Sequence, residues 1–243
     1  MRFTLKEKAA LAVAIAATGS ALLLGVWTWH VASVADDPVP APLLAVSDRL
    51  IDDPFPEVDW ETWSSVNPDV VGWVTVPGTG ISQPVVQAPA DNPRFYLDHD
   101  VTRAWNPYGC PYLDAGCSLL GFGSPIALVF GHHMNEDDMF ARFASYSDEF
   151  YAQSHREILL QTPERKMALE VIAVDVVDAD REPKVLTFES DEEYGAWVAS
   201  LLSGAEVVLD PDASPESLVA FCTCSYGGSN ERTIVYAEET GVA

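Results

Sequence analysis

The residues best suited to chemistry lie beside apolar segments in the second half of the chain. Cys224 closely follows the apolar run 218–221, and a turn-rich segment separates it from Arg232. If the segments on either side of this turn form a hairpin, the thiol and the guanidinium lie close together at its mouth. A thiolate is a nucleophile, and a neighbouring guanidinium can stabilise the thiolate, a substrate carbonyl or a developing oxyanion. The pair is therefore typical of cysteine nucleophile chemistry, although a single cysteine is often only a packed thiol.

Two consecutive histidines, His132 and His133, could supply the proton transfer that such chemistry needs. They follow the apolar run 126–130, and an imidazole exchanges protons near neutral pH. The residues alone do not choose between the two, and we expect one of them to be a bystander. A metal site built from both histidines, Cys222 and Cys224 is the rival interpretation, but a Cys-x-Cys spacing is too short for the usual zinc knuckle. We predict neither a metal nor a cofactor.

The pattern along the chain predicts a mostly β fold with added helices. Eight short segments have a strand-like composition and are separated by turns rich in Gly, Pro and Asn. They are residues 71–76, 81–87, 94–97, 126–131, 157–162, 167–177, 217–224 and 233–238. Many short strands separated by turn signals are typical of a barrel or a sandwich.

Three further segments have helical patterns. They are residues 57–66, 137–153 and 191–202. The first ends at Asn67-Pro68, because the residue before a proline disfavours helix. Ser190 has the position of an N-cap for the third, with Glu193 three residues later. Residues 98–124 between the strands show no regular pattern.

The N-terminal part predicts a membrane anchor. No charged side chain occurs from Ala9 to Ala35, and about 20 apolar residues suffice to cross a bilayer as a helix. Basic residues precede this stretch and Asp36 follows it, so the positive-inside rule places the N-terminus in the cytoplasm and the rest outside. A cleaved signal peptide is the alternative, since residues 33–35 resemble a cleavage site. Both interpretations export the remaining chain.

These signals divide the chain into four parts. Residues 1–8 are expected to be a cytoplasmic tail, 9–35 a single-pass signal-anchor in the cell membrane, 36–56 a proline-rich juxtamembrane linker and 57–243 an extracellular catalytic domain. The whole sequence has 37 acidic and 13 basic residues and a net charge of −24. Such a surface repels phosphate backbones, so nucleic acid is excluded as a partner.

The motifs around the candidate residues resemble those of class B sortases. These motifs are Gly72-Trp73-Val74, Val76-Pro77-Gly78-Thr79, Pro84-Val85-Val86-Gln87, Phe95-Tyr96-Leu97, Phe130-Gly131-His132-His133 and Thr223-Cys224 followed by Arg232. The resemblance spans roughly residues 43–239, and it rests on the order and spacing of the motifs rather than on any single one. It implies a closed eight-stranded sortase-type β-barrel with an N-terminal helical appendage and a helix inserted before the last two strands.

The same resemblance implies an activity. Sortases are cysteine transpeptidases of Gram-positive bacteria, and they cleave a C-terminal sorting motif of secreted proteins through a thioacyl-enzyme. They then join the protein to an amine of a cell-wall peptidoglycan precursor or of a pilin. By position, Cys224 corresponds to the nucleophile, His132 to the proton donor and acceptor, and Arg232 to the group that positions the substrate or stabilises the oxyanion. The residues expected to contact the substrate are Thr223, Phe130 and Ser225.

Two other functions remain open from the sequence. The first is an exported cysteine peptidase that hydrolyses its substrate. Papain-like enzymes place the cysteine before the histidine in the chain, whereas the order here is reversed. The second is a catalytically silent scaffold module of the cell wall, which the intact set of His132, Cys224 and Arg232 disfavours.

The four cysteines predict one disulfide, between Cys110 and Cys117. Cys110 and Cys117 flank a tight segment of an exported domain, so we expect a bridge that adds about 2–3 kcal/mol by the chain-entropy estimate. Cys222 stands where the family commonly has a small hydroxyl residue, and on a strand it would share a face with Cys224. We expect Cys222 to be free and packed, with an inactivating Cys222–Cys224 bridge as the alternative.

Overall fold

The computed structural model describes residues 53–134, 139–182, 184–225 and 230–241. The predicted tail, the membrane anchor and most of the linker therefore lie outside the described residues. Of the helices within the described ranges, none has the length and apolar character needed to cross a bilayer. From Asp53 onward the chain forms one compact unit.

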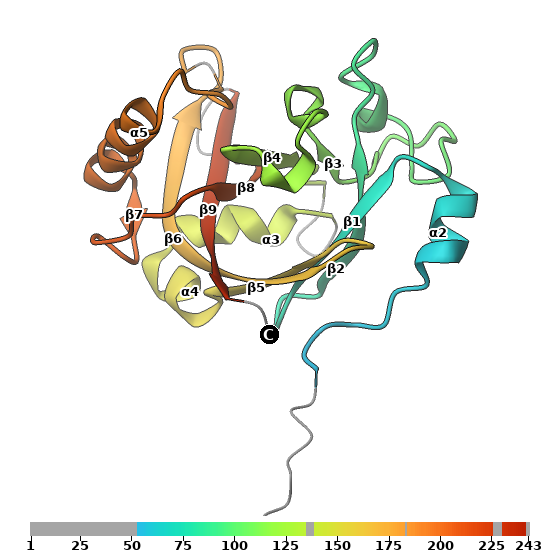
Figure 1. Ribbon diagram of the computed structural model, residues 1–243, viewed down its shortest axis with the longest axis horizontal. Coiled ribbons are helices and arrows are strands. Elements are labelled where there is room, and N and C mark those ends of the chain that lie inside the picture. Colours follow the sequence, from blue (N-terminus) through green and yellow to red (C-terminus); the bar gives the residue numbers. More distant parts are fainter. Residues whose placement is uncertain (1–52, 135–138, 183, 226–229, 242–243) are drawn as a thin grey trace, which may run out of the picture. The chain divides into compact units, whose positions relative to one another are not determined.

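Eight strands close into a barrel (Figure 1). Their order around the ring is β5-β1-β2-β3-β4-β8-β9-β6, and pairing of β5 with β6 closes it. The strands are β1 (Val70–Val76), β2 (Ile81–Gln87), β3 (Tyr112–Leu113), β4 (Ile126–Phe130), β5 (Glu157–Gln161), β6 (Lys166–Asp178), β8 (Leu218–Cys224) and β9 (Glu231–Gly241). A further strand, β7 (Val207–Val208), pairs with β6 outside this ring. The predicted eight-stranded barrel is confirmed.

Strand composition follows from which faces are covered. Buried and partly buried residues alternate along β1, because only the inner face of this strand meets the core. β4 and β8 are instead buried along almost their whole length. Their inner residues belong to the barrel core, and their outer residues belong to a second apolar cluster. Strands covered on both faces read as continuous apolar runs, which explains the composition of both segments.

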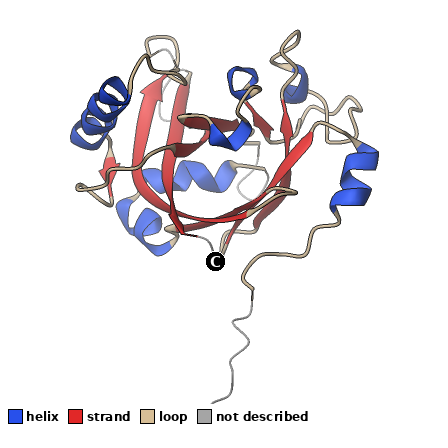
Figure 2. Ribbon diagram, viewed as in Figure 1, coloured by secondary structure: helices blue, strands red, loops and turns tan. Residues whose placement is uncertain are grey.

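A short helical segment fills the inside of the barrel. It consists of α3 (Ala141–Ala144) and the 3-10 turn η4 (Ser145–Ser147), and Figure 2 shows it within the curve of the sheet. Phe143 stacks on Phe221 of β8 with ring centroids 5.0 Å apart and an interplanar angle of 7°. Both rings are fully buried, so they anchor β8 from the inside.

The helix α5 (Asp191–Gly204) covers the outer apolar cluster. It begins as predicted, because Ser190 Oγ accepts a hydrogen bond from Glu193 N at 3.2 Å. Its buried residues Tyr194 and Val198 contact the outer cluster, which includes residues of β4, β8 and β9. The inserted helix therefore supports the strands that carry the candidate residues.

The predicted strand 94–97 is wrong. This segment forms the 3-10 turn η1 (Phe95–Leu97), and β3 takes its place in the ring from a stretch expected to be irregular. The cause is Tyr96, which is fully buried. Its hydroxyl donates to Asp69 at 2.6 Å and accepts from Asn67 Nδ2 at 2.8 Å. These bonds hold the Tyr96 side chain in the interior, and the segment around it forms a turn and not a strand.

The predicted helix 137–153 is also wrong in extent, and its first two residues lie outside the described ranges. The described part divides into α3, η4 and α4 (Glu149–Ser154). Asp148 has an extended conformation, and its side chain caps α4 by accepting from Tyr151 N at 2.8 Å. A residue that caps a new helix cannot continue the previous one. The first predicted helix is shorter than expected and forms α2 (Trp60–Val66).

The expected Cys110–Cys117 disulfide is not formed. Both thiols are free and buried. Cys110 packs in a small cluster with Tyr96, whereas Cys117 belongs to the barrel core and its Sγ lies 3.4 Å from the carbonyl oxygen of Ile126. Because the two side chains enter different apolar clusters, proximity in sequence does not bring the sulfur atoms together.

Gly131 joins β4 to His132 and packs too closely against Phe140 to accept a side chain. A Cβ at this position would lie 2.4 Å from Cγ of Phe140. We expect Gly131→Ala to lower the free energy of unfolding by about 1–3 kcal/mol, the usual cost of overpacking. Urea unfolding measures this change. The control is Gly123→Ala, whose added Cβ meets nothing within 4 Å. Equal losses in the two variants would contradict the close packing at Gly131.

Candidate active site

Cys224 and Arg232 are direct partners across two antiparallel strands. The register of β8 and β9 pairs Cys222 with Ile234 and Cys224 with Arg232. Residues directly opposite each other in such a pair have Cβ atoms about 4.5–5.5 Å apart. The hairpin expected from the sequence is confirmed, and it places Cys224 directly opposite Arg232 at the end of the barrel wall.

His132 reaches the same edge from the other side of Cys224. β4 runs parallel to β8, with Phe130 opposite Cys222. Gly131 N donates to the Cys222 carbonyl at 3.1 Å, which continues the pairing beyond the end of β4. Two residues after Phe130, this register brings His132 alongside Cys224. The order across the three strand ends is therefore His132, Cys224, Arg232.

The strand register assigns Cys224 and Arg232 to the outer face of the barrel, and continuation of the β4–β8 pairing through Gly131 assigns His132 to the same face. In each strand, the residue two positions further into the wall belongs to the apolar cluster beneath α5. Side chains alternate between the faces of a strand, so residues two apart point the same way. The row beneath the candidate residues consists of Phe130, Cys222 and Ile234. The site is thus the polar end of an apolar face.

The ring of His132 is held by the turn η1. Its Nε2 lies 2.7 Å from the carbonyl oxygen of Leu97. A carbonyl oxygen only accepts hydrogen bonds, so Nε2 carries the hydrogen and Nδ1 of the neutral ring is the proton acceptor. Leu97 follows the anchored Tyr96 directly. Sequence reasoning missed this contact because a backbone carbonyl leaves no signal in the side-chain pattern.

His133 contacts the site through a different atom. Its Nδ1 lies 2.8 Å from the carbonyl oxygen of Cys224. The sequence predicts that one of the two histidines is a bystander. In the structure both rings form hydrogen bonds with backbone carbonyls beside the site. One ring holds η1, and the other holds the residue that carries the thiol.

Cys222 is chemically distinct from its neighbour Cys224. Cys222 is free and only 3% exposed, whereas Cys224 is free and partly exposed. Burial raises the pKa of the Cys222 thiol to about 12, and nearby Arg232 opposes the shift. The free, packed Cys222 expected from the sequence is confirmed. In the described ranges, no three His, Cys, Asp or Glu side chains converge to hold a metal ion.

The residues predicted to contact substrate have structural partners of their own. Thr223 is 1% exposed, and its Oγ1 donates to the Gly131 carbonyl at 2.9 Å, which ties the ends of β8 and β4 together. Phe130 is partly buried at the outer cluster. Ser225 N donates to the Glu231 carbonyl at 3.0 Å. The Oγ of Ser225 is buried and has no hydrogen-bond partner in the described part of the chain.

Tyr112 is a residue of this region that the sequence did not indicate. It stacks on Phe130 with ring centroids 5.4 Å apart. Burial raises the pKa of its hydroxyl, while the charges of Arg94 and Arg232 act in the opposite direction. The tyrosine therefore lies within electrostatic reach of Arg232. It was missed because β3 contains only two residues within a glycine-rich stretch.

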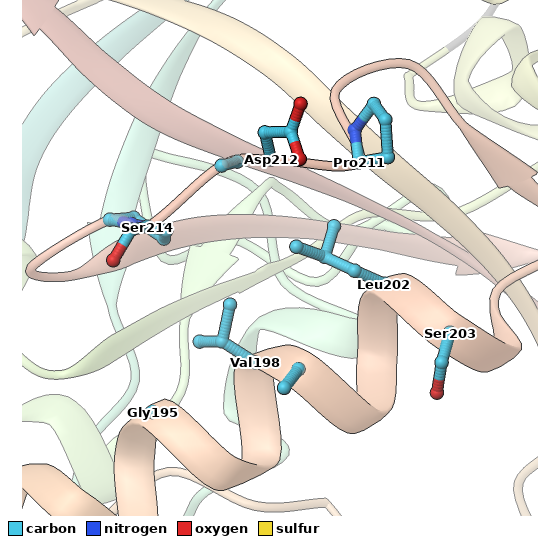
Figure 3. A pocket seen from close by; sticks show the side chains of 10 residues that line it. Gly195, Val198, Leu202, Ser203, Pro211, Asp212 and Ser214 are labelled. Atoms are coloured by element: carbon cyan, nitrogen blue, oxygen red, sulfur yellow. The ribbon is translucent and has the colours of Figure 1, made fainter.

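A separate cavity of about 370 Å³ lies between α5 and residues 211–215 (Figure 3). Val198 and Leu202 line it from the helix, and Pro211 and Asp212 line it from the loop. None of the three candidate catalytic residues borders this cavity, so it is distinct from the strand-end site.

Comparison with known proteins agrees with this geometry. The family model of the sortase domain matches residues 74–240. Sortase B of Staphylococcus aureus is 22% identical over 182 residues, which cover 74% of this chain and 73% of the relative. Sortase B of Listeria monocytogenes is 28% identical over 109 residues, covering 45% and 43%. The crystal structure of Clostridium perfringens sortase B is 26% identical, with a TM-score of 0.68 over 74% of this chain and 99% of that one.

The closed barrel and the row of histidine, cysteine and arginine at its strand ends define a β-barrel cysteine enzyme. The match of the domain model over most of the barrel makes the assignment specific. The chain belongs to the sortase family of cysteine transpeptidases, and its relatives and structural neighbours are class B sortases.

The raised pKa of Cys222 predicts a pH dependence of stability. The thiol has an ordinary pKa of 9.0 and a folded-state pKa of about 12. Between these values the unfolded chain loses this proton while the folded chain keeps it, so the free energy of unfolding falls as pH rises. The slope for one such group is about 1.4 kcal/mol per pH unit.

We therefore expect Cys222→Ser to show a shallower loss of stability than wild type between pH 9 and pH 10.5. Urea unfolding at a series of pH values measures both slopes. Other buried groups titrate in both proteins, so their contribution cancels in the difference. Identical slopes would show that Cys222 ionises as easily in the folded protein as in the unfolded chain.

Proposed function

We propose that this chain is a membrane-anchored class B sortase whose catalytic domain faces the outside of the cell. It cleaves a C-terminal sorting motif of secreted proteins and joins them to an amine of a cell-wall precursor or of a pilin. The observation that carries this proposal is the strand register, in which His132, Cys224 and Arg232 come from three neighbouring strand ends and share one face. The uncharged stretch 9–35 and its basic flank support the anchor and its orientation.

The first half-reaction forms a thioacyl-enzyme. His132 Nδ1 accepts the proton of the Cys224 thiol, and the thiolate attacks the carbonyl carbon of the scissile peptide bond. The tetrahedral intermediate collapses when the carbon–nitrogen bond breaks. His132 then gives its proton to the leaving amine. The acyl group remains on Cys224 Sγ as a thioester.

Arg232 is the proposed donor to the oxyanion in this step. The amide of Ser225, which follows the nucleophile, already donates to the Glu231 carbonyl within the hairpin. The guanidinium has five N–H donors, and its Nη1 also contacts the Glu231 carbonyl, at 3.0 Å. This bond holds the guanidinium opposite Cys224, where a charge-assisted hydrogen bond can meet the oxyanion.

The second half-reaction transfers the acyl group. An uncharged amine of the acceptor attacks the thioester carbonyl, and His132 accepts the proton that the amine loses. The carbon–sulfur bond breaks, and the imidazolium returns a proton to Cys224. The products are a new peptide bond and the free enzyme. Water in place of the amine would give hydrolysis, so dependence on an amine separates a transpeptidase from a peptidase.

The central test is intact-mass spectrometry of the full-length protein in detergent. The protein is incubated with a pool of candidate sorting peptides, with and without triglycine. We expect a thioacyl adduct on wild type, its absence in Cys224→Ala, and a triglycine-capped peptide product. Product without triglycine dependence would identify a hydrolase. An unmodified wild type whose Cys224 also resists alkylation would favour a silent scaffold.

The role of Arg232 predicts a separate kinetic effect. Removing a group that stabilises the oxyanion typically lowers kcat by about 10²–10³-fold, and we expect this loss in Arg232→Ala. Initial rates with the peptide found in the pool assay measure it. The matched control is Arg165→Ala, because Arg165 forms an exposed ion pair with Glu239 away from the site. Similar rates for the two variants would show that Arg232 does not stabilise the oxyanion.

A further inference from the structure

The second histidine of the pair contacts the nucleophile itself. His133 Nδ1 lies 2.8 Å from the carbonyl oxygen of Cys224, a residue 91 positions away in the sequence. The neighbouring His132 turns its Nε2 to a different carbonyl, that of Leu97, at 2.7 Å. The two rings therefore bind the two sides of the site, the turn η1 on one side and the end of β8 on the other.

Both contacts fix which nitrogen carries a hydrogen. The partner is a backbone carbonyl oxygen in each case, and such an oxygen only accepts hydrogen bonds. Nδ1 of His133 must therefore donate, whereas in His132 the donor is Nε2. The two adjacent histidines thus donate from different ring nitrogens. This leaves Nδ1 of His132 for proton exchange and commits Nδ1 of His133 to a structural bond.

The position of the accepting carbonyl gives this bond its importance. Cys224 is the last residue of β8, so its carbonyl lies where the strand ladder ends. The inner row of the same strand end is already fixed, because Thr223 is buried and donates to the Gly131 carbonyl at 2.9 Å. The next peptide plane, between Cys224 and Ser225, is held at both ends: Ser225 N donates to the Glu231 carbonyl at 3.0 Å, and His133 Nδ1 donates to the Cys224 carbonyl at 2.8 Å. The bond from His133 is the one that ties this plane to the segment carrying His132.

We propose that His133 is a positioning residue of the transpeptidation reaction. By donating from Nδ1 to the Cys224 carbonyl, it holds the nucleophile alongside His132 and opposite Arg232. This role requires no contact between His133 and the substrate. This inference rests on the proposed roles of Cys224 and His132, and it adds a function for the second histidine that the catalytic set does not include.

The kinetic test compares three substitutions at this position in the full-length protein. We expect His133→Ala to lower kcat about tenfold with KM within twofold of wild type, since small misplacements of reacting groups cost rate. His133→Asn should recover activity to within about threefold of wild type, because its amide nitrogen occupies the position of Nδ1. In His133→Gln the amide lies one bond further out, so activity should stay low.

His155 provides a matched control. Its Nδ1 lies 2.9 Å from the Tyr151 carbonyl, so it makes the same type of bond at the end of α4, and its ring stacks on Tyr151. We expect His155→Ala to keep the kcat of wild type. Wild-type activity in His133→Ala overturns the proposal, and so does failure of His133→Asn to recover activity. A loss in His155→Ala equal to that in His133→Ala also overturns it, since the effect would then be one of general stability.

A second measurement requires no substrate. The full-length protein is labelled with ¹⁵N-histidine, and nitrogen–proton correlation spectra are recorded at about pH 8.5, above the ordinary imidazole pKa of about 6.5. Loss of signals in His133→Asn and His132→Ala assigns the two rings. We expect a protonated Nδ1 in His133 and a protonated Nε2 in His132. A bare Nδ1 in His133 overturns the proposal whatever the activity.

The two measurements separate the failure of this inference from failure of the proposed function. If wild type turns over no peptide, or if Cys224→Ala remains active, the proposed function fails, and the nitrogen spectra still decide whether His133 donates to the Cys224 carbonyl. If wild type is active and Cys224→Ala is inactive, the proposed function stands. The kinetics of the His133 variants then decide the inference alone.

Discussion

The parallel pairing of β4 with β8 is the constraint on which the site depends. Parallel strands end at the same edge of a sheet, so the residues that follow β4 arrive beside the last residue of β8. β9 runs antiparallel to β8 and therefore begins at that edge. The end of β4 and the hairpin of β8 and β9, which is distant from it in sequence, thus bring His132, Cys224 and Arg232 to one edge. No loop has to fold onto another to assemble this row.

Burial on both faces holds this pairing in register. The stacked rings of Phe143 and Phe221 fix β8 from inside the barrel, and α5 covers the same strands from outside. A slip by one residue would exchange the two faces and expose the apolar row beneath the site. The inserted helix α5 therefore helps to position the candidate residues, because its packing favours the register in which Cys222 faces outward.

Hydrogen bonds to backbone carbonyls complete the geometry that the strands begin. The carbonyls of Leu97, Gly131 and Cys224 accept from His132, Thr223 and His133 respectively. Such bonds leave the thiol and the guanidinium available for chemistry. Burial distinguishes the two cysteines at the end of β8: it raises the pKa of the Cys222 thiol within the apolar cluster, whereas Cys224 is partly exposed at the polar end of the strand.

The sequence by itself determined the class of fold and the family, and it proposed the three residues that the strand register brings to one edge of the barrel. Periodicity, turn residues and motif order are local signals, and they located most of the strands and the cap of α5. The tertiary structure alone decided that Tyr96 anchors a turn, that Cys110 and Cys117 enter different clusters, and which nitrogen of each histidine is used. These outcomes depend on contacts between segments far apart in the chain, and local patterns carry no information about such contacts.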